Sequence, residues 1–228
     1  AAAPAMLVAA CEPKLPVTVS TTPKIDLPGL ERAIGALAAE AAPAALGVGL
    51  INLESGEAFL FKGERRFPMM SIFKLPLGAA VLSEVDAGRL SLDEPFILTD
   101  SDLSPSNSPI SAGWPARRDY LARELLEAAM VGSDNTAADV LMKRIGGPGA
   151  LTAWLDSRHL TGLRIDRYER ELQPESFGMA SFRPDWRDPA VYSAVRARIP
   201  AATRMAAMRA YLADPRDTAT PRGMVEFL

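Results

Sequence analysis

A change in the spacing of apolar residues along the chain sets the strongest limit on its fold. Between residues 48 and 61, the sequence "VGLINLESGEAFLF" holds two apolar runs joined at Ser55-Gly56, which is typical of a β-hairpin. From Ile72 almost to the last residue, apolar side chains instead recur every three or four positions, as in packed helices. Another helix is expected after Pro28-Gly29. This order predicts an α+β protein whose strands and helices form separate layers.

The predicted hairpin needs further structure to complete it. Two strands alone form a marginal sheet, and no later segment shows a convincing strand pattern. At 228 residues and 48% hydrophobic residues, the chain can bury a substantial core, so one folded unit is expected. Its net charge of -3, with acidic and basic residues interspersed, makes nucleic acid an improbable partner.

The first 27 residues differ in composition from the rest. The segment "LVAAC", which ends at Cys11, is similar to a bacterial lipobox, and the Pro- and Thr-rich residues after it suit a tether. We therefore predict a partial lipoprotein signal and tether over residues 1–27, with a lipid anchor through Cys11. The alternative is an apolar N-terminus in which Cys11 has no such role. No apolar run is long enough to span a bilayer.

Ser71 and Lys74 stand three residues apart at the predicted start of an apolar helix. That spacing places a hydroxyl and an amine on one helix face, where a lysine with a lowered pKa can accept the serine proton. The helix N-terminus would also stabilise an oxyanion formed beside the serine. The alternative is structural: Ser71 caps the helix, and Lys74 extends to solvent.

Three later segments complete a candidate site. The first is Ser133-Asp134-Asn135, in a turn between two predicted helices, which by itself indicates only helix capping. The second is "RYERELQ", in which Glu169 lies in a stretch without helical periodicity and could activate a water as a general base. The third is "DPRDTATP", which contains Asp217 and is predicted to form a turn ahead of a short helix.

Together and in this order, these four segments resemble the class A serine β-lactamases, whose motifs include S-x-x-K and S-D-N. The resemblance extends from about Leu30 to Leu228. It implies a β-lactamase/transpeptidase-like fold, with an antiparallel sheet flanked by helices and an all-helical subdomain. It also implies a small-molecule β-lactam substrate and a monomer in the bacterial periplasm or cell envelope.

The resemblance assigns a role to each candidate residue. Ser71 would be the nucleophile that opens the β-lactam ring, and Lys74 its proton partner. Ser133 would pass a proton to the leaving nitrogen, and Glu169 would activate the water that deacylates the enzyme. The remaining assignments are substrate contact for Asn135 and Gln173, and an ion pair that closes the omega loop for Arg167 and Asp217.

The chain also departs from the family pattern. Gln173 stands where the family has asparagine, and Arg170 replaces a usual proline. Residues 174–215 form an insertion in the omega loop, with a helical pattern in "AATRMAAMRAYLA". We expect either a helical flap that restricts substrate entry or a packed addition away from the site.

A third family motif, K-T-G, does not occur after Ser133 in these 228 residues. We therefore expect residues 28–228 to be an incomplete domain that lacks the C-terminal sheet strands and final helix. Because losing one oxyanion-hole donor costs on the order of a hundredfold in rate, this polypeptide should hydrolyse β-lactams poorly.

Other functions share part of this pattern. A penicillin-binding D-Ala-D-Ala peptidase and a non-enzymatic β-lactam sensor, each acylated at Ser71, are the main alternatives, and Glu169 argues against both. A relative acting on another amide or ester is a third. The single Cys and single His offer no metal cluster, and we expect neither a metal nor an organic cofactor.

Overall fold

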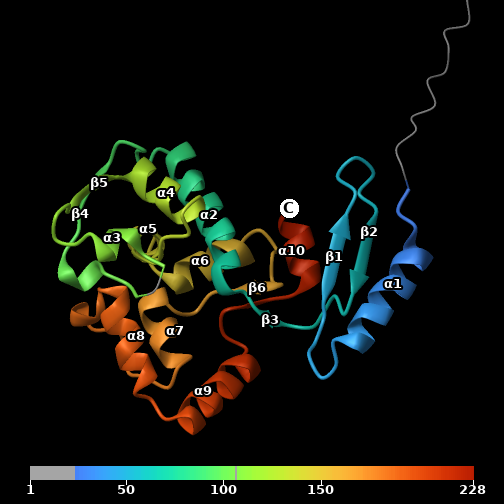
Figure 1. Cartoon of the computed structure of the whole chain (residues 1–228). Helices are drawn as coiled ribbons and strands as arrows, with labels where there is room; N and C mark the ends of the chain where they lie inside the picture. The colour runs from blue at the N-terminus through green and yellow to red at the C-terminus, as the bar shows by residue number, and fades with distance from the viewer. Residues whose placement is uncertain (1–23, 106) are drawn as a thin grey trace, which may run out of the picture.

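A computed structural model describes residues 24–105 and 107–228 (Figure 1). Cys11 and the predicted tether up to residue 23 lie outside the described residues. A small sheet part and a larger helical part lie side by side in Figure 1. The sheet part comprises α1 (Leu27–Glu40), β1 (Val48–Ile51), β2 (Ala58–Phe61) and the last helix, α10 (Pro221–Phe227).

The predicted hairpin is confirmed. Strands β1 and β2 pair antiparallel in a two-stranded sheet with Val48 opposite Phe61, and α1 and α10 flank them (Figure 1). Gly49 permits the close approach of α10, because a Cβ there would lie 2.8 Å from the Pro221 carbonyl oxygen. The predicted first helix is also present, although α1 buries none of its residues fully. A two-stranded sheet offers little surface for it to cover.

The expectation that no later segment would supply strands is wrong. Among the described residues, five further short strands form two small antiparallel sheets. One sheet has the order β3-β7-β6 and the other pairs β4 with β5. Their bounds are Phe67–Pro68 (β3), Pro95–Ile97 (β4), Asp119–Leu121 (β5), Leu163–Arg164 (β6) and Thr218–Ala219 (β7). Strands of two or three residues are too short to show an alternating pattern.

The helical part contains most of the core. Helix α5 lies at its centre, with eight of its ten residues buried, and packs against α2, α4, α6 and α7. Leucines from four helices, among them Leu77, Leu125 and Leu141, are essentially inaccessible. The elements of this part are η1 (Met70–Phe73), α2 (Lys74–Asp86), η2 (Asp100–Asp102), α3 (Pro109–Ala112), α4 (Ala122–Met130), α5 (Asn135–Arg144) and α6 (Pro148–Asp156).

The omega-loop region forms its own helices at the lower edge of Figure 1. These are α7 (Glu169–Glu175), η3 (Pro184–Trp186), α8 (Pro189–Ala197) and α9 (Ala201–Ala213), so the predicted helix over "AATRMAAMRAYLA" is confirmed. Phe182 and Tyr192 pack edge to face with ring centroids 6.2 Å apart, and both belong to the main core. The insertion is therefore anchored to the helical part by buried aromatic side chains.

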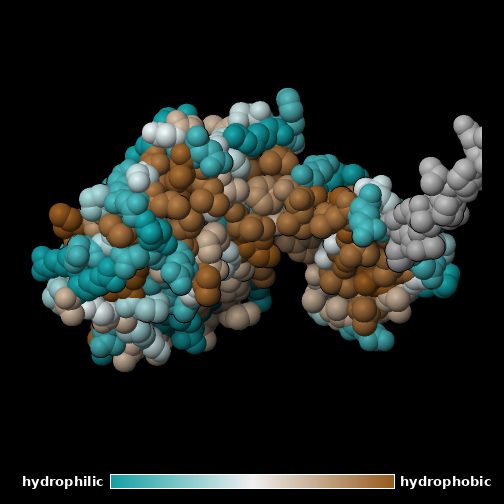
Figure 2. Space-filling model, turned by 90° about the horizontal axis from the view of Figure 1, so that it is seen from above, coloured by the Kyte–Doolittle hydropathy of each residue, from teal (hydrophilic) through white to brown (hydrophobic). Residues whose placement is uncertain are grey.

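Hydrophobic residues are not confined to the interior. Figure 2 shows them over much of the upper face, including the region between the helical part and the sheet part. Exposed large apolar side chains include Leu50 on β1 and Ile72 and Leu75 beside the candidate nucleophile. Over the part of the chain that the structure describes, no helix combines the length and the apolar character that crossing a bilayer requires.

Candidate active site

Ser71 lies in η1, the short helical turn just before α2, where the backbone is strained. The residue before it, Met70, has a φ of 49°, which is unusual for a side chain other than glycine. Ser71 is exposed, whereas Lys74 is only 2% exposed. No side chain caps α2, whose N-cap is Phe73. The structural alternative for this pair, a capping serine and a lysine extended to solvent, is therefore wrong.

Four oxygen atoms surround the Lys74 amine. Its Nζ lies 2.8 Å from the Ser133 carbonyl oxygen, 2.6 Å from Asn135 Oδ1, 2.9 Å from Ser133 Oγ and 3.3 Å from Ser71 Oγ. The carbonyl and amide oxygens can only accept hydrogen bonds. They can therefore use the two N–H groups of a neutral amine, which leaves its lone pair for a hydroxyl proton. Ser133 Oγ lies 3.1 Å from Ser71 Oγ, which closes the set.

The surroundings of Lys74 favour that neutral form. Burial lowers the pKa of Lys74 below its ordinary value, while the negative charges of Glu169, Asp134 and Asp139 act in the opposite direction. A lowered pKa makes the neutral amine, which can accept a proton, easier to form than in an exposed lysine. The geometry and the electrostatics thus both fit a proton acceptor for Ser71.

The S-D-N turn is held by its central residue. Asp134 caps α5 by accepting from the Ala137 N–H at 2.9 Å, and it also accepts from Ser108 Oγ and the Ile110 N–H, each at 3.0 Å. Ser133 has a φ of 52°, so the turn aims its hydroxyl and carbonyl at Lys74 with local strain. The same turn therefore caps α5 and positions Ser133 in the candidate site.

Glu169 is the first residue of α7 and is 4% exposed. The prediction of an irregular loop here is wrong, because residues 169–175 form a helix, too short to show periodicity in sequence. Burial raises the pKa of Glu169, against the opposing effects of Lys74 and of Gln173, whose Nε2 donates to Glu169 Oε2 at 2.8 Å. Gln173 thus reaches the glutamate despite its longer side chain.

Asp139 is a site residue that the motifs did not reveal. Its Oδ1 accepts from the Glu169 N–H at 2.8 Å, and its Oδ2 accepts from the Arg170 N–H at 3.0 Å and from Ser104 Oγ at 2.5 Å. Burial raises its pKa to about 7. Asp139 follows Asn135 by four residues on α5, so a polar side chain on the buried face of that helix was the available signal.

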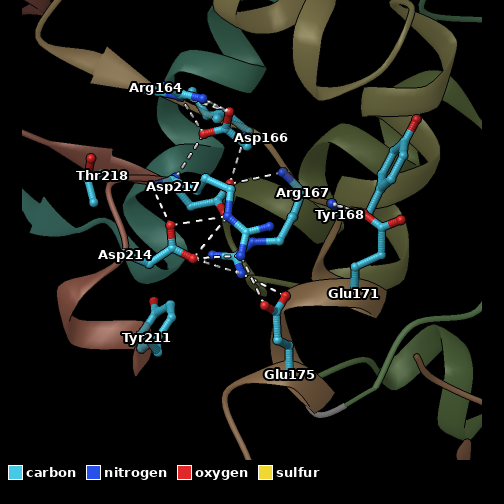
Figure 3. Close-up of polar contacts among 12 residues, drawn as sticks. Arg164, Asp166, Arg167, Tyr168, Glu171, Glu175, Tyr211, Asp214, Asp217 and Thr218 are labelled. Atoms are coloured by element: carbon cyan, nitrogen blue, oxygen red, sulfur yellow. Dashed lines mark hydrogen bonds and ion pairs between the residues drawn. The ribbon is translucent and has the colours of Figure 1, made fainter. Parts of the chain in front are cut away.

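The predicted Arg167–Asp217 ion pair is present and buried (Figure 3). Arg167 Nε donates to Asp217 Oδ2 at 2.6 Å, while Asp217 Oδ1 accepts from the Asp166 and Arg167 N–H groups. A second contact joins Arg167 Nη1 to Glu175 Oε2 at 2.7 Å. Burial would lower the pKa of Arg167, but its hydrogen bonds to Asp217 and Glu175 raise it. This network fixes both ends of α7.

The insertion also reaches the turn that contains Met70 and Ser71. The hydroxyl of Tyr211, on α9, donates to Met70 Sδ at 3.1 Å, and burial raises the pKa of Tyr211 to about 12. Tyr211 therefore stays neutral at physiological pH and touches the residue that precedes Ser71. Nothing in the sequence pattern predicts this contact.

The structure brings eight predicted site residues into two linked groups. Ser71, Lys74, Ser133 and Asn135 form one, and Glu169 with Gln173 is tied to the same helix, α5, through Asp139. Arg167 and Asp217 support the second group, because Arg167 also contacts Glu175 at the end of α7. Within residues 24–105 and 107–228, no three His, Cys, Asp or Glu side chains gather as metal ligands.

Comparison with known proteins places this site in a family. The model of the "Beta-lactamase enzyme family" matches residues 29–228. β-Lactamase L2 of Stenotrophomonas maltophilia is 35% identical over 81% of this chain and 56% of its own length. β-Lactamase VEB-1 of Pseudomonas aeruginosa is 32% identical over 58% of this chain and 44% of its own length.

Solved structures agree with these relatives. An ancestral class A β-lactamase aligns with 87% of this chain at a TM-score of 0.64 and 31% identity, over 62% of its own length. A chromosome-encoded β-lactamase mutant of Vibrio parahaemolyticus aligns with 87% of this chain and 62% of its own length, at a TM-score of 0.62 and 26% identity. The chain spans about half the length of the curated relatives it matches. It belongs to the β-lactamase enzyme family and is similar to its class A members.

Proposed function

We propose that the protein hydrolyses β-lactam rings through an acyl-enzyme on Ser71. The hydrogen-bonded set of Ser71, Lys74 and Ser133, whose lysine interacts electrostatically with the buried Glu169, is the observation that supports this proposal most. It supplies a nucleophile, a proton acceptor, a proton donor and a second base within one site.

In the first half of the proposed reaction, Ser71 Oγ attacks the β-lactam carbonyl carbon. Its proton passes to Lys74 Nζ, directly or through Glu169 and a water, and the carbonyl becomes an oxyanion. As the ring C–N bond breaks, Ser133 Oγ gives its proton to the nitrogen and is reprotonated by Lys74. The product of this half is an ester between Ser71 and the opened ring.

In the second half, Glu169 removes a proton from a water, which attacks the ester carbonyl. The bond to Ser71 Oγ breaks, and the serine recovers its proton. A raised pKa makes Glu169 a stronger base than an exposed glutamate, and the Gln173 amide holds its carboxylate. The proton that Ser71 lost stays on the ring nitrogen, and Glu169 gives Ser71 the proton taken from the water, so the enzyme returns to its starting state.

Glu169→Gln in the complete gene product tests this proposal. The variant should still acylate but deacylate at least on the order of a hundredfold more slowly, because the water loses its base. Nitrocefin kinetics and intact-protein mass spectrometry would show a burst followed by a stable adduct. Glu171→Gln, an exposed neighbour on α7, is the matched control and should behave as wild type.

The same experiment separates the proposed hydrolase from its alternatives. A wild-type protein that bursts once and keeps its adduct would be a sensor or a peptidase, and Glu169→Gln would then change little. Absence of any adduct on Ser71 would contradict all three. We also propose that the 228-residue polypeptide alone turns over nitrocefin poorly, since it contains no K-T-G motif.

The insertion is proposed to influence which β-lactams enter. The contact of Tyr211 with Met70 supports this role, because it couples α9 to the residue before the nucleophile. Tyr211→Ala should change the ratio of kcat/KM between bulky and small β-lactams several-fold. Leu212→Ala, on the same helix but 62% exposed, is the control. An unchanged ratio in Tyr211→Ala would contradict gating by this contact.

We further propose that the protein is a monomer exported to the bacterial periplasm or cell envelope, with a lipid anchor at Cys11. The support is the lipobox-like sequence alone, since Cys11 lies outside the described residues. Labelling with a radioactive fatty acid should be lost in Cys11→Ser.

A further inference from the structure

A pocket between α8 and α9 lies in the insertion and is separate from the residues of the active site. Its volume is about 440 Å³, and it is lined by Phe177, Ser193, Arg196, Ala197, Ala201, Arg204, Met205 and Met208. This size lies within the range of small-molecule sites. The lining combines an apolar wall of phenylalanine, methionine and alanine with two guanidinium groups.

Neither guanidinium has an acidic partner among the described residues. Arg196 stacks on Phe177, with its Cζ 3.6 Å from the ring centroid, and Arg204 Nη1 donates to the Arg196 carbonyl oxygen at 3.3 Å. The insertion contains six arginines and four acidic residues, although the whole chain has a net charge of -3. Those acids are engaged elsewhere: Glu175 and Asp214 with Arg167 and Arg216, Asp185 with Arg183, and Asp188 as the cap of α8.

Two buried polar atoms of α8 lack partners, and one of them belongs to Arg196, which lines the pocket. Arg196 Nε and the Tyr192 hydroxyl are both inaccessible and have no hydrogen-bond partner in the described chain. They lie four residues apart on one face of α8. An unpaired buried donor is unfavourable, so a ligand that accepts from the Arg196 guanidinium would recover a hydrogen bond.

The start of α9 adds to the positive potential. No side chain caps this 13-residue helix, and Ala201, its first residue, lines the pocket. Unsatisfied N–H groups and the helix dipole favour an anion there. Arg196 lies in the last turn of α8, where the helix dipole stabilises its positive charge. Arg204 lies near the start of α9, where the helix dipole disfavours a positive charge.

We infer that this pocket binds an organic carboxylate with an apolar body. The guanidinium forks of Arg196 and Arg204 would hold the carboxylate, since arginine matches its planar geometry. The apolar body would lie along Phe177, Met205 and Met208. Binding here requires no reaction at Ser71, so it stands independently of the proposed hydrolysis.

Decanoate is a suitable probe, used with the purified protein below its micelle concentration in isothermal titration calorimetry. One saturable site is expected, with binding at least tenfold weaker for decanol, which lacks the charge, and for acetate, which lacks the apolar body. Arg204→Gln and Arg196→Gln should each weaken decanoate binding tenfold or more. Arg209→Gln removes the same charge from an exposed position of α9 and should leave binding unchanged.

Several results would overturn the inference. They are the absence of saturable decanoate binding, equal binding of decanol, and equal loss in Arg209→Gln and Arg204→Gln. Thermal melts of each variant show whether it is folded. Because Arg204 is only partly buried, its variant keeps the test decisive if Arg196→Gln fails to fold.

Discussion

At the scale of single residues, the site depends on a few buried groups whose charge is disfavoured by their position. Lys74 and Glu169 are each almost inaccessible to solvent. Burial lowers the pKa of Lys74 and raises the pKa of Glu169, and both shifts favour the neutral form of the group. Opposite pKa shifts of this kind in titratable groups of one site are typical of functional sites. This is the electrostatic basis for assigning two proton acceptors to one serine.

Asp139 gives this arrangement a measurable pH dependence. Its pKa is about 7 in the folded protein and 3.8 as the ordinary value, so the folded state binds its proton more tightly than the unfolded state. The resulting stabilisation is fully present below about pH 4 and is lost as the pH rises through about 7. The folded protein should therefore lose stability from this group between those values.

Asp139→Asn tests that dependence, because asparagine does not titrate. Its free energy of unfolding should rise relative to wild type by about 2 to 4 kcal/mol between pH 4 and pH 8. Urea unfolding at several pH values measures the difference. A difference independent of pH would show that Asp139 titrates as it does when unfolded. Asp100→Asn, at an exposed position, is the control.

At the scale of elements, α7 is a short helix held by polar contacts at both ends. Asp139 binds its first two N–H groups, and Arg167 with Asp217 and Glu175 ties its two ends together (Figure 3). Seven residues with a proline at position 174 would not form a stable helix alone. These contacts therefore determine where Glu169 lies.

Arg167→Ala should be among the most destabilising changes to this element. It leaves the buried Asp217 carboxylate without its counter-ion, which typically costs about 3 to 5 kcal/mol. Arg89→Ala breaks the exposed ion pair with Glu84 and should cost far less, because solvent screens that pair. Denaturant unfolding compares the two. A loss in Arg167→Ala no larger than in Arg89→Ala would mean that Asp217 finds other partners.

At the scale of the whole molecule, one core connects α2 to α5, α6 and the insertion. Leu77 on α2 is 1% exposed, whereas Leu82 on the same helix is 44% exposed. Leu77→Ala should lower the free energy of unfolding by about 2 to 5 kcal/mol, because it removes buried methyl groups and leaves a cavity. Leu82→Ala should cost less than about 1 kcal/mol. Equal urea midpoints for the two variants would contradict this view of the core.

The sequence alone determined the order of hairpin and helices and the residues of the candidate site. Its periodicity predicted α1, the β1-β2 hairpin and α9, because those segments are long enough for the period to show. The motifs predicted Ser71, Lys74, Ser133 and Glu169, and the resemblance predicted the Arg167–Asp217 pair. These are local patterns, or patterns of known spacing.

Only the tertiary structure decided the contacts between segments distant in sequence. The two- and three-residue strands, the helical form of residues 169–175, the support of Glu169 by Asp139 and the contact of Tyr211 with Met70 all arise this way. None has a sequence period, because each is stabilised by a partner from another part of the chain. Burial, which shifts the pKa values of Lys74 and Glu169, likewise exists only once the chain has folded around them.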